Sequence, residues 1–192
     1  MKLSQKKSFL SILTILSLSC ISLSAQEYAN PTLKSIHERA SVRSYTSEPV
    51  SREQLVELAK AGMAAPTGSN KQPWEFILIQ DRATLDKIGE VKPPVGKAPA
   101  AIVVLGDNSI SGSWVLDCAA ATENILLAAT SMGLGTVWTG AYNNQKFEAI
   151  LQDLLELPDG IMPLAVIAVG YADGTPTPKN KYVESKVHFE KY

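Results

Sequence analysis

The chain has 192 residues, with 18 basic and 19 acidic side chains and a net charge of −1 at pH 7. This length suits one domain with a substantial core, and the charge balance gives no electrostatic footprint for nucleic acid. The 2 histidines and 2 cysteines do not have metal-ligand spacing, and no G-x-S-x-G elbow occurs. We therefore expect no metal site and no Ser-His-Asp hydrolase, and we expect a cofactor to supply any chemistry.

The first 25 residues have the order of a secretory signal peptide. Three lysines precede an apolar run at residues 9–18, and small residues follow up to Ala25. The run holds about ten residues, whereas a membrane-spanning helix needs about 20. We therefore expect cleavage after Ala25, export to the periplasm or the medium, and a mature domain at residues 26–192. The segment ending at Cys20 also resembles a lipoprotein box, so a lipid anchor there remains an alternative.

Helix and strand patterns alternate in the first half of the mature chain. Ser51 and Gln54 form a capping box that opens a helix, and Pro66 stops this helix after about residue 65. The other expected elements are a short helix at 32–40, a strand at 74–79, a surface helix at 82–90, a loop with three prolines at 92–99, and a doubly covered strand at 100–105.

The second half is dominated by a long helix at residues 113–132. Apolar side chains cover nearly its whole circumference, so we expect burial on most sides, at the hub of the core or at a subunit interface. We interpret Cys118 within it as a small buried hydrophobe. A short strand from Val137, a helix at 143–155 and an apolar strand at 163–169 follow. The last twenty or so residues have little core of their own and must pack on something else. The class is α/β or α+β.

Four stretches contain basic, hydroxyl, amide and glycine residues in an arrangement that composition alone does not explain. Arg39, Ser41 and Arg43 could hold a phosphate, although basic residues after a helix often only complement its dipole. A rigid polar loop follows Pro66, and its Asn70 and Gln72 side chains can both donate and accept hydrogen bonds; an ordinary connection remains the alternative. The third and fourth stretches are a glycine-rich turn and strand at 133–141, and Gly-Tyr at 170–171 with a basic tail.

In this order the four stretches resemble the nitroreductase family over residues 32–192. The family's Arg-x-Ser-x-Arg-x-aromatic pattern, its Pro-Thr-x-x-Asn-x-Gln-Pro-Trp loop, and its central helix with an early Asp, a middle Asn and a closing Gly-Leu-Gly are all matched. The positions that match are Arg39, Ser41, Arg43, Tyr45, Pro66, Thr67, Asn70, Gln72, Pro73, Trp74, Asp117, Asn124 and residues 133–135. The family's closing pattern, a strand into Gly-Tyr followed by a Lys-x-Arg pair and a His-aromatic-x-x-aromatic end, is matched with one change: Lys181 stands where arginine is usual.

The resemblance implies an α+β fold with a central, mostly antiparallel sheet surrounded by helices, an intertwined homodimer, and FMN between the subunits. The FMN-binding residues it implies are Arg39, Ala40, Ser41, Arg43, Pro66, Thr67, Gly68, Ser69, Asn70, Gln72, Thr139, Gly140, Lys179 and Lys181. Within this set, Arg39, Ser41, Lys179 and Lys181 hold the phosphate. Arg43 stabilises negative charge near N1 of the ring, the loop after Pro66 comes from the other subunit, and the Thr139-Gly140 backbone offers an N–H to N5. Trp138 is either a pocket residue or a core aromatic.

The activity implied is transfer of a hydride from NADH or NADPH through flavin N5 to a nitroaromatic, a quinone or a similar small acceptor, in a ping-pong cycle. No side chain need act as an obligatory acid or base, which agrees with the scarcity of histidine. Three alternatives remain: an exported non-catalytic flavin carrier, a specialised activity such as reductive dehalogenation, and an interaction domain without flavin. The short stretch between Glu90 and Pro99 leaves little room for the extra lid that specialised members carry.

Overall fold

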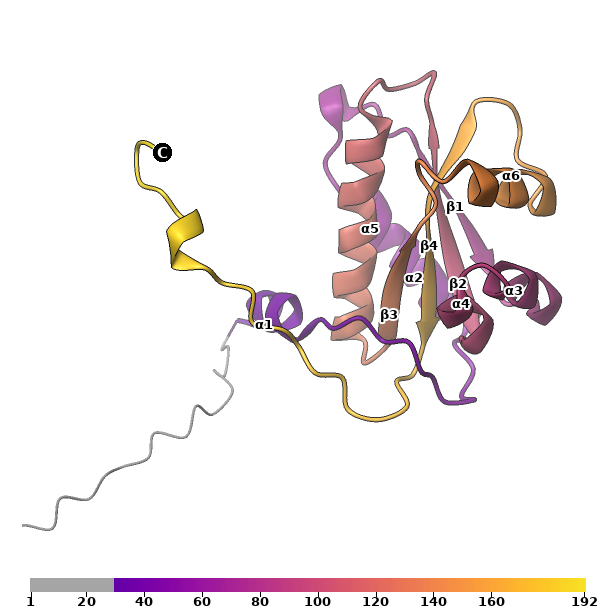
Figure 1. Cartoon of the computed structure of the whole chain (residues 1–192), viewed down its shortest axis with the longest axis horizontal. Helices are drawn as coiled ribbons and strands as arrows, with labels where there is room; N and C mark the ends of the chain where they lie inside the picture. Colours follow the sequence, from indigo (N-terminus) through magenta and orange to yellow (C-terminus); the bar gives the residue numbers. More distant parts are fainter. Residues whose placement is uncertain (1–29) are drawn as a thin grey trace, which may run out of the picture.

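The computed structural model describes residues 30–192 (Figure 1). The predicted signal peptide, its cleavage after Ala25 and the alternative anchor at Cys20 lie outside these residues. Within the described part, no helix is both long enough and apolar enough to cross a membrane.

A 4-stranded sheet forms the centre of the fold, in the order β1-β2-β4-β3. Its strands are β1 (Trp74–Ile79), β2 (Ala100–Asp107), β3 (Gly135–Gly140) and β4 (Ile161–Gly170), and every neighbouring pair is antiparallel. The two middle strands are almost entirely buried, as their unbroken apolar sequences predicted. The α+β class with an antiparallel sheet is therefore confirmed. Because β3 is an edge strand, one of its sides carries no neighbouring strand of this sheet.

Helices cover both faces of the sheet (Figure 1). One face packs against α2 (Arg52–Met63) and α5 (Trp114–Ser131), and the other packs against α3 (Arg82–Gly89), α4 (Pro93–Lys97) and α6 (Gln145–Leu154). The short helix α1 (Pro31–Glu38) lies against the lower half of α5 in Figure 1. The predicted capping box is confirmed: Ser51 Oγ accepts from the Gln54 N–H, and Gln54 Oε1 accepts from the Ser51 N–H.

The prediction of a loop at residues 92–99 was wrong, because α4 forms there. Pro93 and Pro94 occupy its first turn, where a helix does not need their missing N–H groups and their fixed φ suits the helical backbone. Packing then holds this short helix in place. A Cβ on Gly89 would lie 2.5 Å from the Cα of Gly96, so only glycines allow α3 and α4 to approach this closely.

The long helix α5 is the hub of the core, and it is buried or half-buried on most sides, as expected: among its residues only Leu116, Glu123 and Ser131 are exposed. One of its faces packs on the sheet and on α2, whereas Leu116 on another face is 72% exposed. The last residues also lack a core, as predicted: all residues from 173 to 192 are exposed, and the C-terminal part of this segment extends past α1 and away from the body (Figure 1). We call residues 178–192 the arm. A single copy therefore leaves apolar surface uncovered on both α5 and the arm.

Candidate functional site

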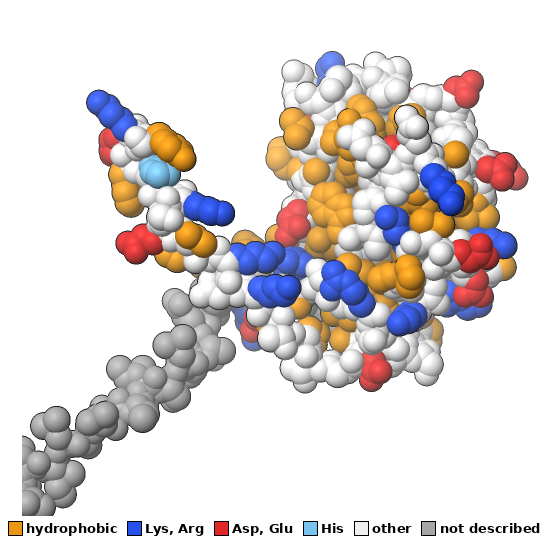
Figure 2. Space-filling view, viewed as in Figure 1, with side chains coloured by type: hydrophobic (Ala, Val, Ile, Leu, Met, Phe, Trp, Pro, Cys, Tyr) orange, Lys and Arg blue, Asp and Glu red, His pale blue; other side chains and the backbone are white. Residues whose placement is uncertain are grey.

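The two ends of the described chain meet around one cavity of about 430 Å³. Residues 39–43, which follow α1, form one side of this cavity, and residues 177–182 of the C-terminal segment form the other. Six of the residues expected to bind the cofactor line it together: Arg39, Ala40, Ser41, Arg43, Lys179 and Lys181. Four of these, Arg39, Ser41, Lys179 and Lys181, were expected at the phosphate, and Arg43 was expected near the ring. We call it the basic cavity. Figure 2 shows Lys and Arg side chains gathered where the arm leaves the body.

The wall after α1 is fixed by contacts with β3 and with the end of β4. The Val42 N–H donates to the Thr136 carbonyl at 2.9 Å, and Ser41 forms a parallel bridge with Thr136. Tyr45 donates its hydroxyl to the Val42 carbonyl at 2.7 Å. Because successive side chains of an extended segment alternate in direction, Val42 is buried while Ser41 and Arg43 are exposed on the cavity side.

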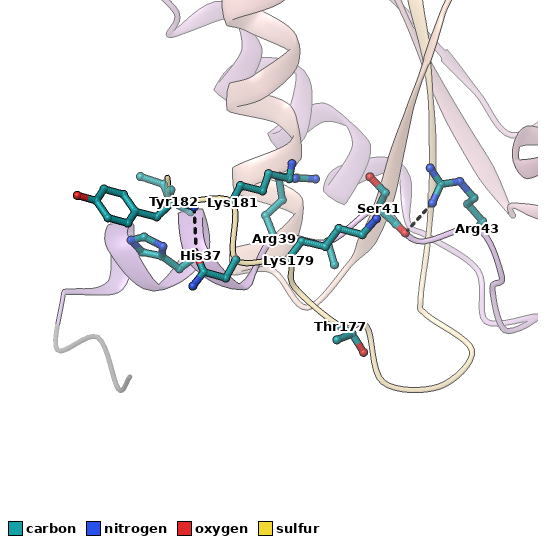
Figure 3. Close-up of a pocket in the computed structure, with 11 residues that line it drawn as sticks. His37, Arg39, Ser41, Arg43, Thr177, Lys179, Lys181 and Tyr182 are labelled. Carbon is teal, nitrogen blue, oxygen red and sulfur yellow. Dashed lines mark hydrogen bonds between the residues drawn. The ribbon is translucent and has the colours of Figure 1, made fainter. Parts of the chain in front are cut away.

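The charges around the basic cavity are mostly positive. Lys179 extends toward Ser41, and Lys181 lies beside Arg39 (Figure 3). Arg39 Nε also lies 3.6 Å from Glu123 Oε1, so one carboxylate offsets part of the charge. Four basic side chains around one opening favour a multiply charged anion, and Ser41 adds a hydroxyl donor.

Tyr45 acts here as a neutral hydrogen-bond donor. Burial raises the pKa of its phenol well above its ordinary value, and the nearby Arg43 opposes this shift only in part. The bond from Tyr45 to Val42 therefore persists at physiological pH, and it holds the segment that carries Ser41 and Arg43.

The polar loop after α2 lies away from the basic cavity. The Gly68 N–H donates to Asp117 Oδ1 at 2.9 Å, at the first turn of α5. Figure 1 shows this loop at the upper end of α5, with α1 and the start of the arm at the lower end. The predicted residues Pro66, Thr67, Gly68, Ser69, Asn70 and Gln72 are therefore not brought to the cavity of their own chain.

Thr139 and Gly140, which were also expected to bind the cofactor, lie at the end of the edge strand β3. The Thr136 carbonyl points away from β4, toward Val42. Because alternate residues of a strand direct their backbone groups to the same side, the N–H and carbonyl groups of Trp138 and Gly140 face the same open edge. A Cβ on Gly140 would meet no atom within 4 Å. Thr139 instead donates its hydroxyl to the Val166 carbonyl of β4 at 2.7 Å, so a flat ligand could approach at Gly140.

Trp138 is 37% exposed, so it is not a fully buried core aromatic. Its strand neighbour Ile167 belongs to the core cluster under α5, which places Trp138 on the α5 side of the sheet. Tyr142, two residues beyond Gly140, is 43% exposed and packs edge-to-face on Trp114 with ring centroids 5.5 Å apart. The edge around Gly140 is therefore flanked by partly exposed aromatic rings.

Sequence reasoning missed several cavity residues. Ile36, His37, Thr177, Asn180 and Tyr182 line the cavity alongside the cations. His37 and Tyr182 lie together at the end of the cavity farthest from Arg43 (Figure 3). Proximity to Arg39 and Lys181 in the sequence was the only available signal for them. By contrast, Cys118 is buried as predicted: its thiol donates to the Leu105 carbonyl at 3.3 Å, and burial raises its pKa to about 12.

No cluster of metal-ligating side chains occurs among residues 30–192. The helix α5 nevertheless carries several buried or half-buried polar residues, among them Asp117 and Asn124. Asn124 donates its amide to the Ala61 carbonyl at the end of α2, at 3.1 Å. Seven residues separate them, about two helical turns, so both lie on the face toward α2 and its loop.

Comparisons with known proteins agree on one family. The family model described as "Nitroreductase family" matches residues 36–92 and 92–171. A relative from Methanothermobacter thermautotrophicus, named as an NADH dehydrogenase/NAD(P)H nitroreductase, is 38% identical over 166 residues, covering 83% of this chain and 87% of its own.

Two crystal structures show the same fold. One, from Parabacteroides distasonis and carrying the same name, is 46% identical with a TM-score of 0.82, and the match covers 85% of this chain and 99% of that one. The other is a nitroreductase from Desulfovibrio desulfuricans in complex with FMN. It is 30% identical with a TM-score of 0.76, over 86% of this chain and 99% of that one.

Proposed function

Because the chain belongs to the nitroreductase family, we propose that its basic cavity and the β3 edge hold FMN, and that two copies of the chain complete the site. The chain is a flavin-dependent NAD(P)H oxidoreductase. The observation that carries the proposal is the single cavity that gathers Arg39, Ser41, Arg43, Lys179 and Lys181 from both ends of the chain.

The phosphate end fits the residues present. A phosphate monoester carries close to two negative charges near neutral pH, and the three cations Arg39, Lys179 and Lys181 complement it, with the Ser41 hydroxyl as a further donor. Each charge-assisted hydrogen bond contributes about 1.5–3 kcal/mol. Lys181 acts there as a point charge, because an ammonium group lacks the two-pronged geometry of a guanidinium group.

The ring end fits as well. The Gly140 N–H faces an open edge, and the missing side chain leaves space for a flat ring beside the strand. Arg43 lies at the end of the cavity farthest from His37 and Tyr182 (Figure 3). A permanent positive charge there stabilises negative charge on the ring. The exposed rings of Trp138 and Tyr142 restrict water near Gly140.

The second copy is proposed because one chain leaves the site incomplete. The loop with Ser69, Asn70 and Gln72 lies at the opposite end of α5 from its own cavity (Figure 1). Large apolar side chains are exposed on α5 and on the arm: Leu116 is 72% exposed, Phe189 is 85% exposed and Tyr192 is 107% exposed. Packing α5 against its symmetry mate, with each arm on the partner, covers this apolar surface. It also brings each loop to the flavin of the other subunit.

When bound, FMN supplies hydride transfer at N5 from NADH or NADPH to a nitroaromatic, a quinone or a similar small oxidised acceptor, in a ping-pong cycle. The side chains bind and orient it: Arg39, Lys179 and Lys181 fix the phosphate, and the Gly140 backbone positions the ring. Tyr45 stays protonated and supports Ser41 and Arg43 rather than exchanging protons. No side chain is proposed as an obligatory acid or base.

Export is proposed separately, from the leader-like order of the first 25 residues. Mass spectrometry of the protein recovered from its native compartment tests it, with a mature terminus at Gln26 expected. A lipid-modified Cys20 would instead establish the anchored alternative. If the protein is exported, a non-catalytic flavin carrier remains an alternative function, because NAD(P)H is scarce outside the cytoplasm.

The visible spectrum of the purified protein under nitrogen, before and after addition of NADPH, tests the enzymatic function. We expect a yellow protein that NADPH bleaches and that a quinone restores. A yellow protein that neither NADPH nor NADH bleaches would establish the carrier. A colourless protein that does not bind added FMN would contradict both proposals.

A further inference from the structure

The loop between α2 and β1 holds three non-glycine residues in the left-handed region. Their φ angles are 52° at Ser69, 54° at Asn70 and 49° at Gln72. Such conformations cost free energy and persist only where the surroundings hold them. Two bonds close the loop on itself: the Gln72 N–H donates to Thr67 Oγ1 at 3.1 Å, and the Gln72 amide donates to Asn70 Oδ1 at 3.0 Å.

Asp117 attaches this loop to α5. Its Oδ1 accepts from the Gly68 N–H, and its Oδ2 accepts from the Ser111 hydroxyl, both at 2.9 Å. Ser111 Oγ in turn accepts from the Ser113 N–H at 3.2 Å. Asp117 is 5% exposed and Ser111 is 3% exposed. Both oxygens of a buried carboxylate are thus engaged, and one of them fixes the loop at Gly68.

A second polar residue on the same face of α5 holds the helix that precedes the loop. Asn124 donates to the Ala61 carbonyl, and Gly62 packs so closely on Ile125 that a Cβ there would lie 3.0 Å from Ile125 Cδ1. The end of α2 therefore cannot move freely relative to α5, and Asp117 extends this fixed contact into the loop.

We propose that Asp117 is a positioning residue for the flavin bound by the partner subunit. It holds Gly68 so that Asn70 and Gln72 are presented in one conformation to the ring. The proposal rests on the function proposed above. It specifies action between subunits because the loop is absent from the lining of its own basic cavity and lies at the other end of α5 (Figure 1).

The first test compares Asp117→Leu with Asp117→Asn, by titrating each apoprotein with FMN. Leucine has a similar volume but no acceptor, whereas asparagine keeps an oxygen for Gly68 and offers an N–H to Ser111 Oγ. We expect the Kd for FMN to rise about tenfold to hundredfold in the leucine variant and to stay within about threefold in the asparagine variant. Native affinity in both variants, or an equal loss in both, would overturn the positioning role.

A second pair of variants leaves Asp117 and the core intact. Gly68→Pro removes the donor, and the extended backbone of Thr67, with φ −133° and ψ 156°, accommodates a following proline. Gly68→Ala keeps the donor, and its Cβ would meet nothing nearer than Asp117 Oδ1 at 4.0 Å. We expect the proline variant to bind FMN about tenfold more weakly than the alanine variant. Equal Kd values would overturn the proposal.

Mixed dimers then test whether Asp117 acts across the interface. The Arg39→Ala/Lys179→Ala chain is co-expressed with the Asp117→Leu chain, and the mixed dimer is isolated with two different tags. If Asp117 positions the flavin of the partner subunit, each site combines the basic cavity of one chain with the loop of the other. One site of the mixed dimer then contains all the substitutions and the other contains none, so roughly half of the native flavin content is expected. If Asp117 served its own cavity, each site would be damaged and no flavin would return. Native FMN affinity in the Arg39→Ala/Lys179→Ala homodimer would instead contradict the proposed function itself.

Discussion

Gly135 packs directly against Val42, and a Cβ on Gly135 would lie 2.8 Å from Val42 Cγ2. This contact joins β3 to the segment that carries Ser41 and Arg43. We predict that Gly135→Ala lowers the free energy of unfolding by about 1–3 kcal/mol, because the added methyl group has no space. FMN affinity should fall as well, since Val42 lies between the two cavity residues. Urea denaturation of the apoprotein and FMN titration measure the two effects.

Gly140, on the same strand, provides the matched comparison. Its Cβ would meet nothing within 4 Å of the chain itself, so Gly140→Ala should change the free energy of unfolding by less than about 0.5 kcal/mol. FMN binding should nevertheless weaken, because the methyl group occupies the space proposed for the ring. Unchanged FMN affinity in a stable Gly140→Ala protein would show that the flavin ring does not bind at this edge of β3.

The local structure was largely predictable from the sequence. The capping box at Ser51 and Gln54 and the apolar run in β4 each depend on neighbouring residues, and both were found. The error at α4 arose because a proline can either stop a helix or begin one, and only the packing of Gly89 on Gly96 decides between the two.

Long-range relations were less predictable. Resemblance to a family pointed to Arg39 and Lys179, which the cavity brings together. His37 and Tyr182 carry no such pattern, and their place in the cavity depends on how the arm crosses α1. The hydrogen bond between Gly68 and Asp117 joins residues 49 positions apart, and no periodicity in the sequence encodes it.

Cys118 makes a specific contribution to stability at alkaline pH. Burial raises the pKa of its thiol from 9.0 to about 12, so between these values the unfolded chain loses this proton while the folded chain keeps it. Stability therefore falls as pH rises through this window. We predict that the free energy of unfolding decreases less between about pH 8 and about pH 10 in Cys118→Ala than in the native protein. Urea titrations at both pH values measure this, and equal slopes would contradict it.

The exposed face of α5 is predicted to be the dimer interface. Leu116→Asp should leave the chain folded, because the side chain is 72% exposed, but it should dissociate the dimer by placing a charge in an apolar contact. Light scattering during size-exclusion chromatography gives the mass, and circular dichroism confirms folding. Val91→Asp is the control, since Val91 is 37% exposed and lies between α3 and α4, away from α5. A dimeric Leu116→Asp protein would rule out this interface.

The central claim is that cations from both ends of the chain anchor a flavin phosphate in the basic cavity. Equilibrium titration of the apoprotein with FMN tests it most directly, in the native chain and in Arg39→Ala/Lys179→Ala. Loss of two charge-assisted contacts predicts a Kd at least about a hundredfold higher in the double variant. An FMN affinity equal to that of the native protein would contradict the account.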